Sequence, residues 1–153
     1  MPLLNTEWRP VSPTQAEGHP AYGFEGWLLF FYAYALFGLA LPIMSVFGGG
    51  GGTAAMFGAE NVTMMRTVNA VRLILLLPFL VLAPMKHRWM PAATIAAYWL
   101  SFAIMAVALL VGDVPARRTG IVMSLDAVTA LLYTAYLVFS VRVNVTYRHR
   151  VPS

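Results

Sequence analysis

Four stretches of about twenty predominantly apolar residues dominate this chain of 153 residues, and they constrain its fold more than any other feature. A helix needs roughly 20 such residues to cross ~30 Å of hydrocarbon. The predicted spans cover about residues 26–47, 64–83, 91–111 and 120–141. Because backbone polar groups must be satisfied inside the bilayer, each span should be a helix. The pattern therefore predicts an all-α integral membrane protein, a four-helix transmembrane bundle.

The composition excludes several classes of protein. Apolar residues make up 59% of the chain, charged residues 10%, and the mean hydropathy is +0.71. A soluble domain needs far more charge to cover its surface. With no cysteine, the chain has no disulfide, thiol nucleophile, iron–sulfur cluster or cysteine-bound zinc. The net charge of +4 is not gathered in a basic stripe, so we expect no nucleic-acid partner.

Two polar segments flank the predicted transmembrane domain of residues 26–141. Residues 1–25 are interrupted by prolines and show no apolar period, so we expect an extended or loosely ordered N-terminal arm. They lack the basic start and short apolar segment of a signal peptide. Residues 142–153 form a basic tail. Short links between spans predict antiparallel neighbours.

The distribution of basic residues predicts the orientation of the chain. The arm, the connection between the second and third spans, and the tail share one side, which holds six of these residues; the other side holds three. The six are Arg9, Lys86, Arg88, Arg142, Arg148 and Arg150, and the three are Arg66, Arg117 and Arg118. Because basic residues favour the cytoplasmic side, both termini are predicted to be cytoplasmic.

Asp126 is the most informative single residue, because an aspartate near the centre of a membrane helix costs about 3 kcal/mol. It lies about six residues into the fourth predicted span. Arg72 lies at a similar depth in the second, about eight residues from the same side, so an ion pair is predicted. Such a pair can serve a proton or ion relay. Alternatively, it fixes helix register, or its side chains snorkel to the interface.

A polar stripe follows Asp126 along the fourth span. Its members recur at spacings of three and four residues, so they share one helix face: Thr129, Tyr133, Tyr136 and Ser140. A polar face on a membrane helix is expected to meet other helices or a wet cavity. It fits either a substrate path or ordinary interhelical hydrogen bonding.

The third span carries a series of small residues, Ala93, Ala97 and Ser101. Small side chains at a spacing of four let two membrane helices approach closely. This series concerns helix packing.

Cofactor sites are not predicted. The glycine run at residues 48–52 lacks the lysine of a phosphate-binding loop and is interpreted as a flexible turn. The three histidines, His19, His87 and His149, lie outside the spans, so none is placed to bind an intramembrane haem. We expect no metal cluster, no bound cofactor and no nucleophile–base pair.

Two local motifs carry a family resemblance. The arm leads into Gly26-Trp27-Leu28-Leu29-Phe30-Phe31, and a basic connection, Lys86-His87-Arg88-Trp89-Met90-Pro91, precedes the third span. With the four-span layout, these features resemble the DUF2569 family of small bacterial inner-membrane proteins. The motifs cover about a dozen positions, and the glycine run departs from the pattern. The resemblance implies a bacterial inner-membrane location and no particular activity.

Three functions are compatible with these features. The first is a non-catalytic accessory or assembly subunit of a larger membrane complex, such as an energy-converting one, because nine methionines and twenty aromatic residues adapt well to a partner's surface. The second is a small oligomeric transporter or channel lined by Asp126 and Arg72. The third is an enzyme acting on lipids, for which no catalytic constellation is apparent. The accessory subunit is the expectation we favour.

Overall fold

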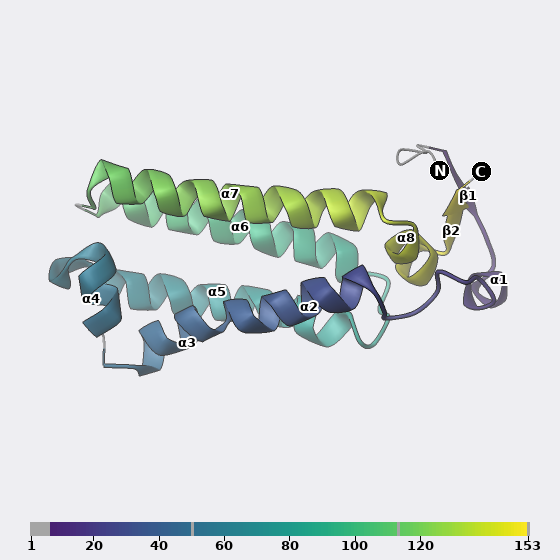
Figure 1. Ribbon diagram of the computed structural model, residues 1–153, viewed down its shortest axis with the longest axis horizontal. Helices are drawn as coiled ribbons and strands as arrows, with labels where there is room; N and C mark the ends of the chain where they lie inside the picture. Colours follow the sequence, from purple (N-terminus) through teal and green to yellow (C-terminus); the bar gives the residue numbers. More distant parts are fainter. Residues whose placement is uncertain (1–6, 50, 113, 153) are drawn as a thin grey trace.

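The protein is an all-α four-helix transmembrane bundle, as predicted (Figure 1). The computed structural model describes residues 7–49, 51–112 and 114–152. The first six residues of the predicted arm, the last residue of the tail, Gly50 and Asp113 lie outside the described residues.

Four segments among the described residues are long and apolar enough to cross a membrane. The first, Trp27–Phe47, consists of α2 (Trp27–Gly38) and α3 (Ala40–Phe47). The second, Ala59–Leu82, consists of the 3₁₀ turn η1 (Ala59–Asn61) and α5 (Val62–Leu82). The third is α6 (Met90–Val111) and the fourth α7 (Ala116–Phe139).

The ends of the second and fourth spans differ from their predicted positions. The second begins earlier than residue 64, because η1 leads directly into α5. The fourth begins at Ala116, after the Pro115 cap, and ends at Phe139. Ser140 has an extended backbone and caps both α7 and the next helix, α8 (Val141–Arg148), which separates the two.

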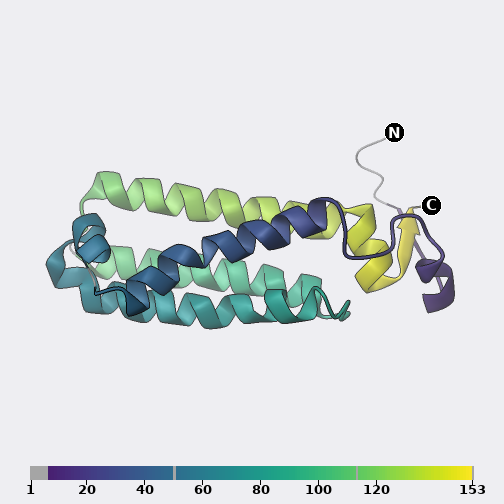
Figure 2. The same ribbon diagram turned by 60° about the horizontal axis from the view of Figure 1, so that its bottom comes forward.

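The four spans contact one another mainly in the order in which they follow along the chain. Helix α5 contacts α3 and α6, and α6 in turn contacts α7. Figure 1 shows α3 and α7 on different sides of the bundle, and Figure 2 shows the α2–α3 segment running obliquely, with α2 approaching the end of α7 that lies nearer the termini. One core cluster, which includes Leu28, Phe79 and Tyr133, lies towards the chain termini. A second cluster, which includes Phe57, Met65 and Met105, lies towards the opposite end.

The glycine run differs from the flexible turn that was predicted. Gly48 ends α3, and Gly49 has a positive φ of 52° that favours glycine. Gly51 and Gly52 then begin a short helix, α4 (Gly51–Phe57). Arg118 donates hydrogen bonds to the carbonyls of Ala55 and Met56, which tie α4 to the start of α7.

The described part of the N-terminal arm is also more regular than predicted. It forms β1 (Trp8–Pro10) and α1 (Pro13–Glu17), and β1 pairs antiparallel with β2 (Arg150–Pro152). Ser12 and Gln15 form a capping box at the start of α1. Strand pairing between the two ends of the chain is a long-range contact, so local composition did not reveal it.

Helix α8 lies across the end of the bundle and is largely buried. Thr146 accepts a hydrogen bond from the backbone N–H of Gly23 at 3.0 Å, and the Tyr147 hydroxyl donates to the Ala83 carbonyl at 2.7 Å. These bonds attach the tail to both the arm and the end of α5. The predicted basic tail is therefore a packed structural element.

Candidate functional site: a polar cavity between the first and fourth spans

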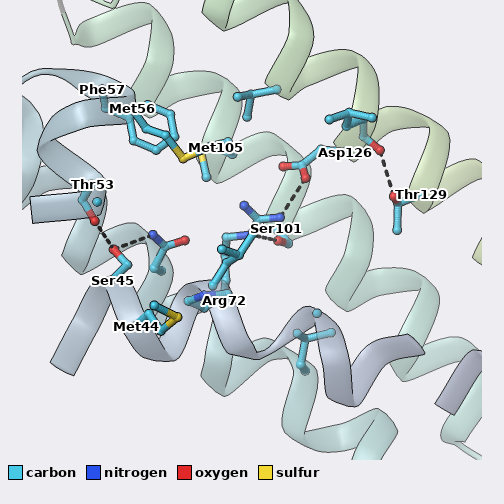
Figure 3. A pocket seen from close by; sticks show the side chains of 18 of the residues that line it. Met44, Ser45, Thr53, Met56, Phe57, Arg72, Ser101, Met105, Asp126 and Thr129 are labelled. Carbon is cyan, nitrogen blue, oxygen red and sulfur yellow. Dashed lines mark hydrogen bonds and ion pairs between the residues drawn. The ribbon is translucent and has the colours of Figure 1, made fainter. Parts of the chain in front are cut away.

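Arg72 on α5 and Asp126 on α7 form the predicted ion pair. Arg72 Nη2 lies 2.9 Å from Asp126 Oδ1, and Arg72 Nε donates to Ser101 Oγ on α6 at 2.8 Å (Figure 3). The two charged side chains are 22% and 19% exposed. One guanidinium group therefore connects three spans.

Both charged residues lie deep in their spans. Arg72 comes ten residues after Val62, where α5 begins, and Asp126 comes ten residues after Ala116, where α7 begins. At 1.5 Å per residue, each is about 15 Å from the end of its helix, half the thickness of ~30 Å of hydrocarbon. The pair thus lies near the middle of the bundle's length.

A second polar network was not predicted, and Ser45 on α3 is its centre. Ser45 Oγ accepts hydrogen bonds of 2.9 Å from both Thr53 Oγ1 on α4 and Asn69 Nδ2 on α5. Arg66 Nε donates to the Ser45 carbonyl at 3.1 Å. The available signal was the single serine of the first span together with Asn69, which stands three residues from both Arg66 and Arg72.

The two networks line a cavity of about 510 Å³. Its wall is mostly apolar and comes from all four spans and α4. Leu41 and Met44 on α3 and Leu125 on α7 line it and are 71%, 66% and 64% exposed. Because these three side chains reach the surface from two different spans, the mouth of the cavity lies between α3 and α7.

Aromatic contacts hold α2 and α7 together at the end nearer the termini. The Phe31 ring lies 4.9 Å from that of Tyr133, centroid to centroid, and 4.5 Å from that of Tyr136. The Tyr133 hydroxyl donates to the Phe31 carbonyl at 2.7 Å. The first and fourth spans therefore meet at this end, and the cavity lies between them farther along.

The predicted polar stripe divides into three environments. Thr129 lines the cavity beside Asp126, and its hydroxyl donates to the Leu125 carbonyl. Tyr133 and Tyr136 pack against α2, and Ser140 accepts a hydrogen bond from the Val143 N–H at the start of α8. The stripe does not form one continuous path along α7.

The predicted small-residue series lies on the inner side of α6. Ala97 and Ser101 are buried, and Ala93 is half-buried. Ser101 has an additional role, because its hydroxyl accepts the hydrogen bond from Arg72.

An exposed apolar stripe on the first span was also missed. Its side chains recur at spacings of three and four residues and are between 52% and 81% exposed: Trp27, Phe30, Tyr34, Phe37, Leu41 and Met44. We call these six residues the first-span stripe. Its spacing is visible in the sequence, but it was obscured by the nearly continuous apolar character of the span.

Metal-binding groups are not gathered anywhere in the described part of the chain, where no three His, Asp or Glu side chains cluster. His19 and His87 each accept a hydrogen bond from a nearby backbone N–H through Nδ1. His149 ends α8 in a left-handed conformation. All three lie outside the four spans.

Comparison with known proteins gives no relative of this chain: no family model, no curated protein and no solved structure matches it. The resemblance to the DUF2569 family stays a prediction.

Proposed function

We propose that the protein is a non-catalytic accessory or assembly subunit that packs against a larger integral membrane complex. The first-span stripe is the observation that carries this proposal. Residues at alternating spacings of three and four lie on one helix face, and such a face is where one helix packs against another. Lipid tails require no such periodicity, whereas a neighbouring helix does.

The composition of the stripe supports the same function. Four of its members are aromatic, and aromatic side chains are enriched in the cores of protein interfaces. In the most apolar part of the first span, 11% of the residues are buried, against 33% in α6. The first span therefore has most of its surface available to a partner's transmembrane helix.

The proposed location is the bacterial inner membrane, with both termini in the cytoplasm. The excess of basic residues on the side of the termini supports this orientation. The pairing of β1 with β2 supports a common side for the two termini, since both strands belong to one small sheet.

Gentle affinity purification from native membranes, followed by mass spectrometry, tests the accessory role. We expect stoichiometric recovery of a larger membrane complex with the wild-type protein. The Phe30→Ala/Phe37→Ala variant should not recover the complex, because this variant lacks two rings of the stripe. The Leu29→Ala/Leu36→Ala variant is the matched control, since these side chains are exposed at the same seven-residue spacing outside the stripe. Recovery of the wild-type protein alone would contradict the proposal.

A second candidate, a small oligomeric transporter or channel, is favoured by the presence of Arg72 and Asp126 in the cavity. Intramembrane ionisable groups commonly mark ion or substrate paths. Reconstituted wild-type protein should then carry a proton- or ion-linked flux that Asp126→Asn abolishes. Absence of flux from vesicles containing correctly folded protein would exclude this candidate.

A further inference from the structure

The cavity between α3 and α7 is placed to receive a molecule from the hydrocarbon layer. Its mouth is formed by exposed side chains of two spans, Leu41, Met44 and Leu125. Arg72 and Asp126 lie about 15 Å along their helices, at the level of the bilayer centre. A ligand at this depth reaches the cavity sideways, from the membrane.

Arg72 offers unused hydrogen-bond donors to this cavity. A guanidinium group has five N–H donors, and Arg72 uses two of them in bonds to Ser101 and Asp126. Asp126 Oδ1 already accepts from Arg72, whereas Oδ2 is buried and accepts no hydrogen bond from the described residues. The group that complements Arg72 is therefore a hydrogen-bond acceptor.

Charge balance decides what kind of acceptor fits. Arg72 and Asp126 together carry no net charge, so a charged head group would have no counterion in the pair. Moving a charge to the centre of a bilayer costs about 2.5–3.5 kcal/mol on the lowest scales. An uncharged carbonyl oxygen accepts from a guanidinium group without this cost.

The size and walls of the cavity fit a ring-bearing head group. Its volume of about 510 Å³ lies within the ~300–1,000 Å³ of sites that hold small organic ligands. Phe57, Tyr98 and Met105 contribute flat or flexible apolar surfaces to the wall. The mouth is apolar, which suits a hydrocarbon chain that extends into the bilayer.

We propose that this cavity binds an uncharged amphiphile dissolved in the membrane, whose carbonyl oxygens accept hydrogen bonds from Arg72. Its apolar chain leaves between α3 and α7. A long-chain quinone has this chemistry, and an acylglycerol shares the uncharged carbonyl. This site goes beyond the accessory role. Leu41 and Met44 belong to both the mouth and the first-span stripe, so a partner helix docked along the whole stripe would cover the mouth. The site is therefore proposed for the isolated chain, in which the cavity lies within one molecule.

Native mass spectrometry of the purified protein in detergent tests the site with three probes. Decylubiquinone has ring carbonyls, monoolein has an ester carbonyl, and dodecane has no hydrogen-bond acceptor. We expect a stoichiometric adduct with at least one carbonyl probe and none with dodecane. Tight binding of decylubiquinone identifies a quinone site, and tight binding of monoolein alone identifies an acylglycerol site. Equal binding of all three would overturn the proposal, because it would indicate simple partitioning into the micelle.

Two variants locate the adduct in the cavity. Met44→Trp should reduce binding at least tenfold by obstructing the mouth, whereas Phe37→Trp should not, since Phe37 is 81% exposed and does not line the cavity. The Arg72→Gln/Asp126→Asn variant, which stays neutral, should also weaken binding of the carbonyl probe. Unchanged binding by Met44→Trp and by the double variant, each with the monodispersity of the wild-type protein, would overturn the proposal. These measurements use the isolated chain, so their failure leaves the partner test unaffected.

Discussion

Arg72 and Asp126 are 54 residues apart in the sequence, yet Nη2 of the arginine lies 2.9 Å from Oδ1 of the aspartate. The contact joins the second and fourth spans, and the bond from Arg72 to Ser101 adds the third. A membrane protein without disulfides thus has a specific polar link across its most open region.

The ion pair should show strong energetic coupling. Arg72→Met or Asp126→Leu alone leaves a charge deep in the bundle without its partner, which costs about 3–5 kcal/mol for a buried pair and less where the pair is partly exposed. We expect the double variant to unfold less readily than the sum of the two single effects predicts. Reversible unfolding in mixed micelles measures all four corners of this double-mutant cycle. Additive effects would show that the pair contributes no coupling.

The Ser45 network should stabilise the contact between α3, α4 and α5. Ser45→Ala removes the acceptor of hydrogen bonds from Thr53 and Asn69 and leaves both side chains buried. Because an unsatisfied buried polar group costs about 1–3 kcal/mol, we expect a loss of stability of that order. Ser124→Ala is the matched control, since Ser124 is exposed on α7. Equal unfolding midpoints for the two variants would contradict this role.

The sequence was sufficient to predict the four spans and the proximity of Arg72 and Asp126. Span length is set by bilayer thickness, and an intramembrane charge has few favourable partners, so both follow from local composition. The Ser45 network could not be predicted, because it depends on how α4 folds back onto the first span. The pairing of β1 with β2 was missed for the same reason: contacts between distant segments leave no local pattern in residues 8–10 or 150–152.

Tyr147 should attach α8 to the end of α5. It is 2% exposed, and its hydroxyl donates to the Ala83 carbonyl at 2.7 Å. Tyr147→Phe keeps the ring but removes this bond, at a cost of about 1 kcal/mol. We expect faster hydrogen exchange of the α8 amides in this variant. Tyr22→Phe is the control, because it retains the ring that Lys86 Nζ contacts at 4.4 Å.

The buried hydroxyl of Tyr147 should also make the stability of the protein depend on pH in alkaline solution. Burial raises the pKa of the Tyr147 hydroxyl above its ordinary value of 10.0, because the charged form is disfavoured there. A pKa that is higher in the folded state than in the unfolded state contributes stability that is complete below pH 10. This contribution decreases as the pH rises from the unfolded towards the folded pKa. The difference in stability between wild-type protein and Tyr147→Phe should therefore shrink above about pH 10. A difference that grows with pH would contradict this linkage.

The proposed topology predicts which surfaces are reachable from each side of the membrane. The chain has no native cysteine, so single substitutions report accessibility without background labelling. Thr14→Cys, on α1, and Ala116→Cys, at the start of α7, both replace exposed residues. With both termini cytoplasmic, a membrane-impermeant maleimide added to intact spheroplasts should label Ala116→Cys and spare Thr14→Cys until the membrane is permeabilised. The opposite pattern would reverse the orientation, and it would show that the six-to-three distribution of basic residues does not determine the topology of this protein.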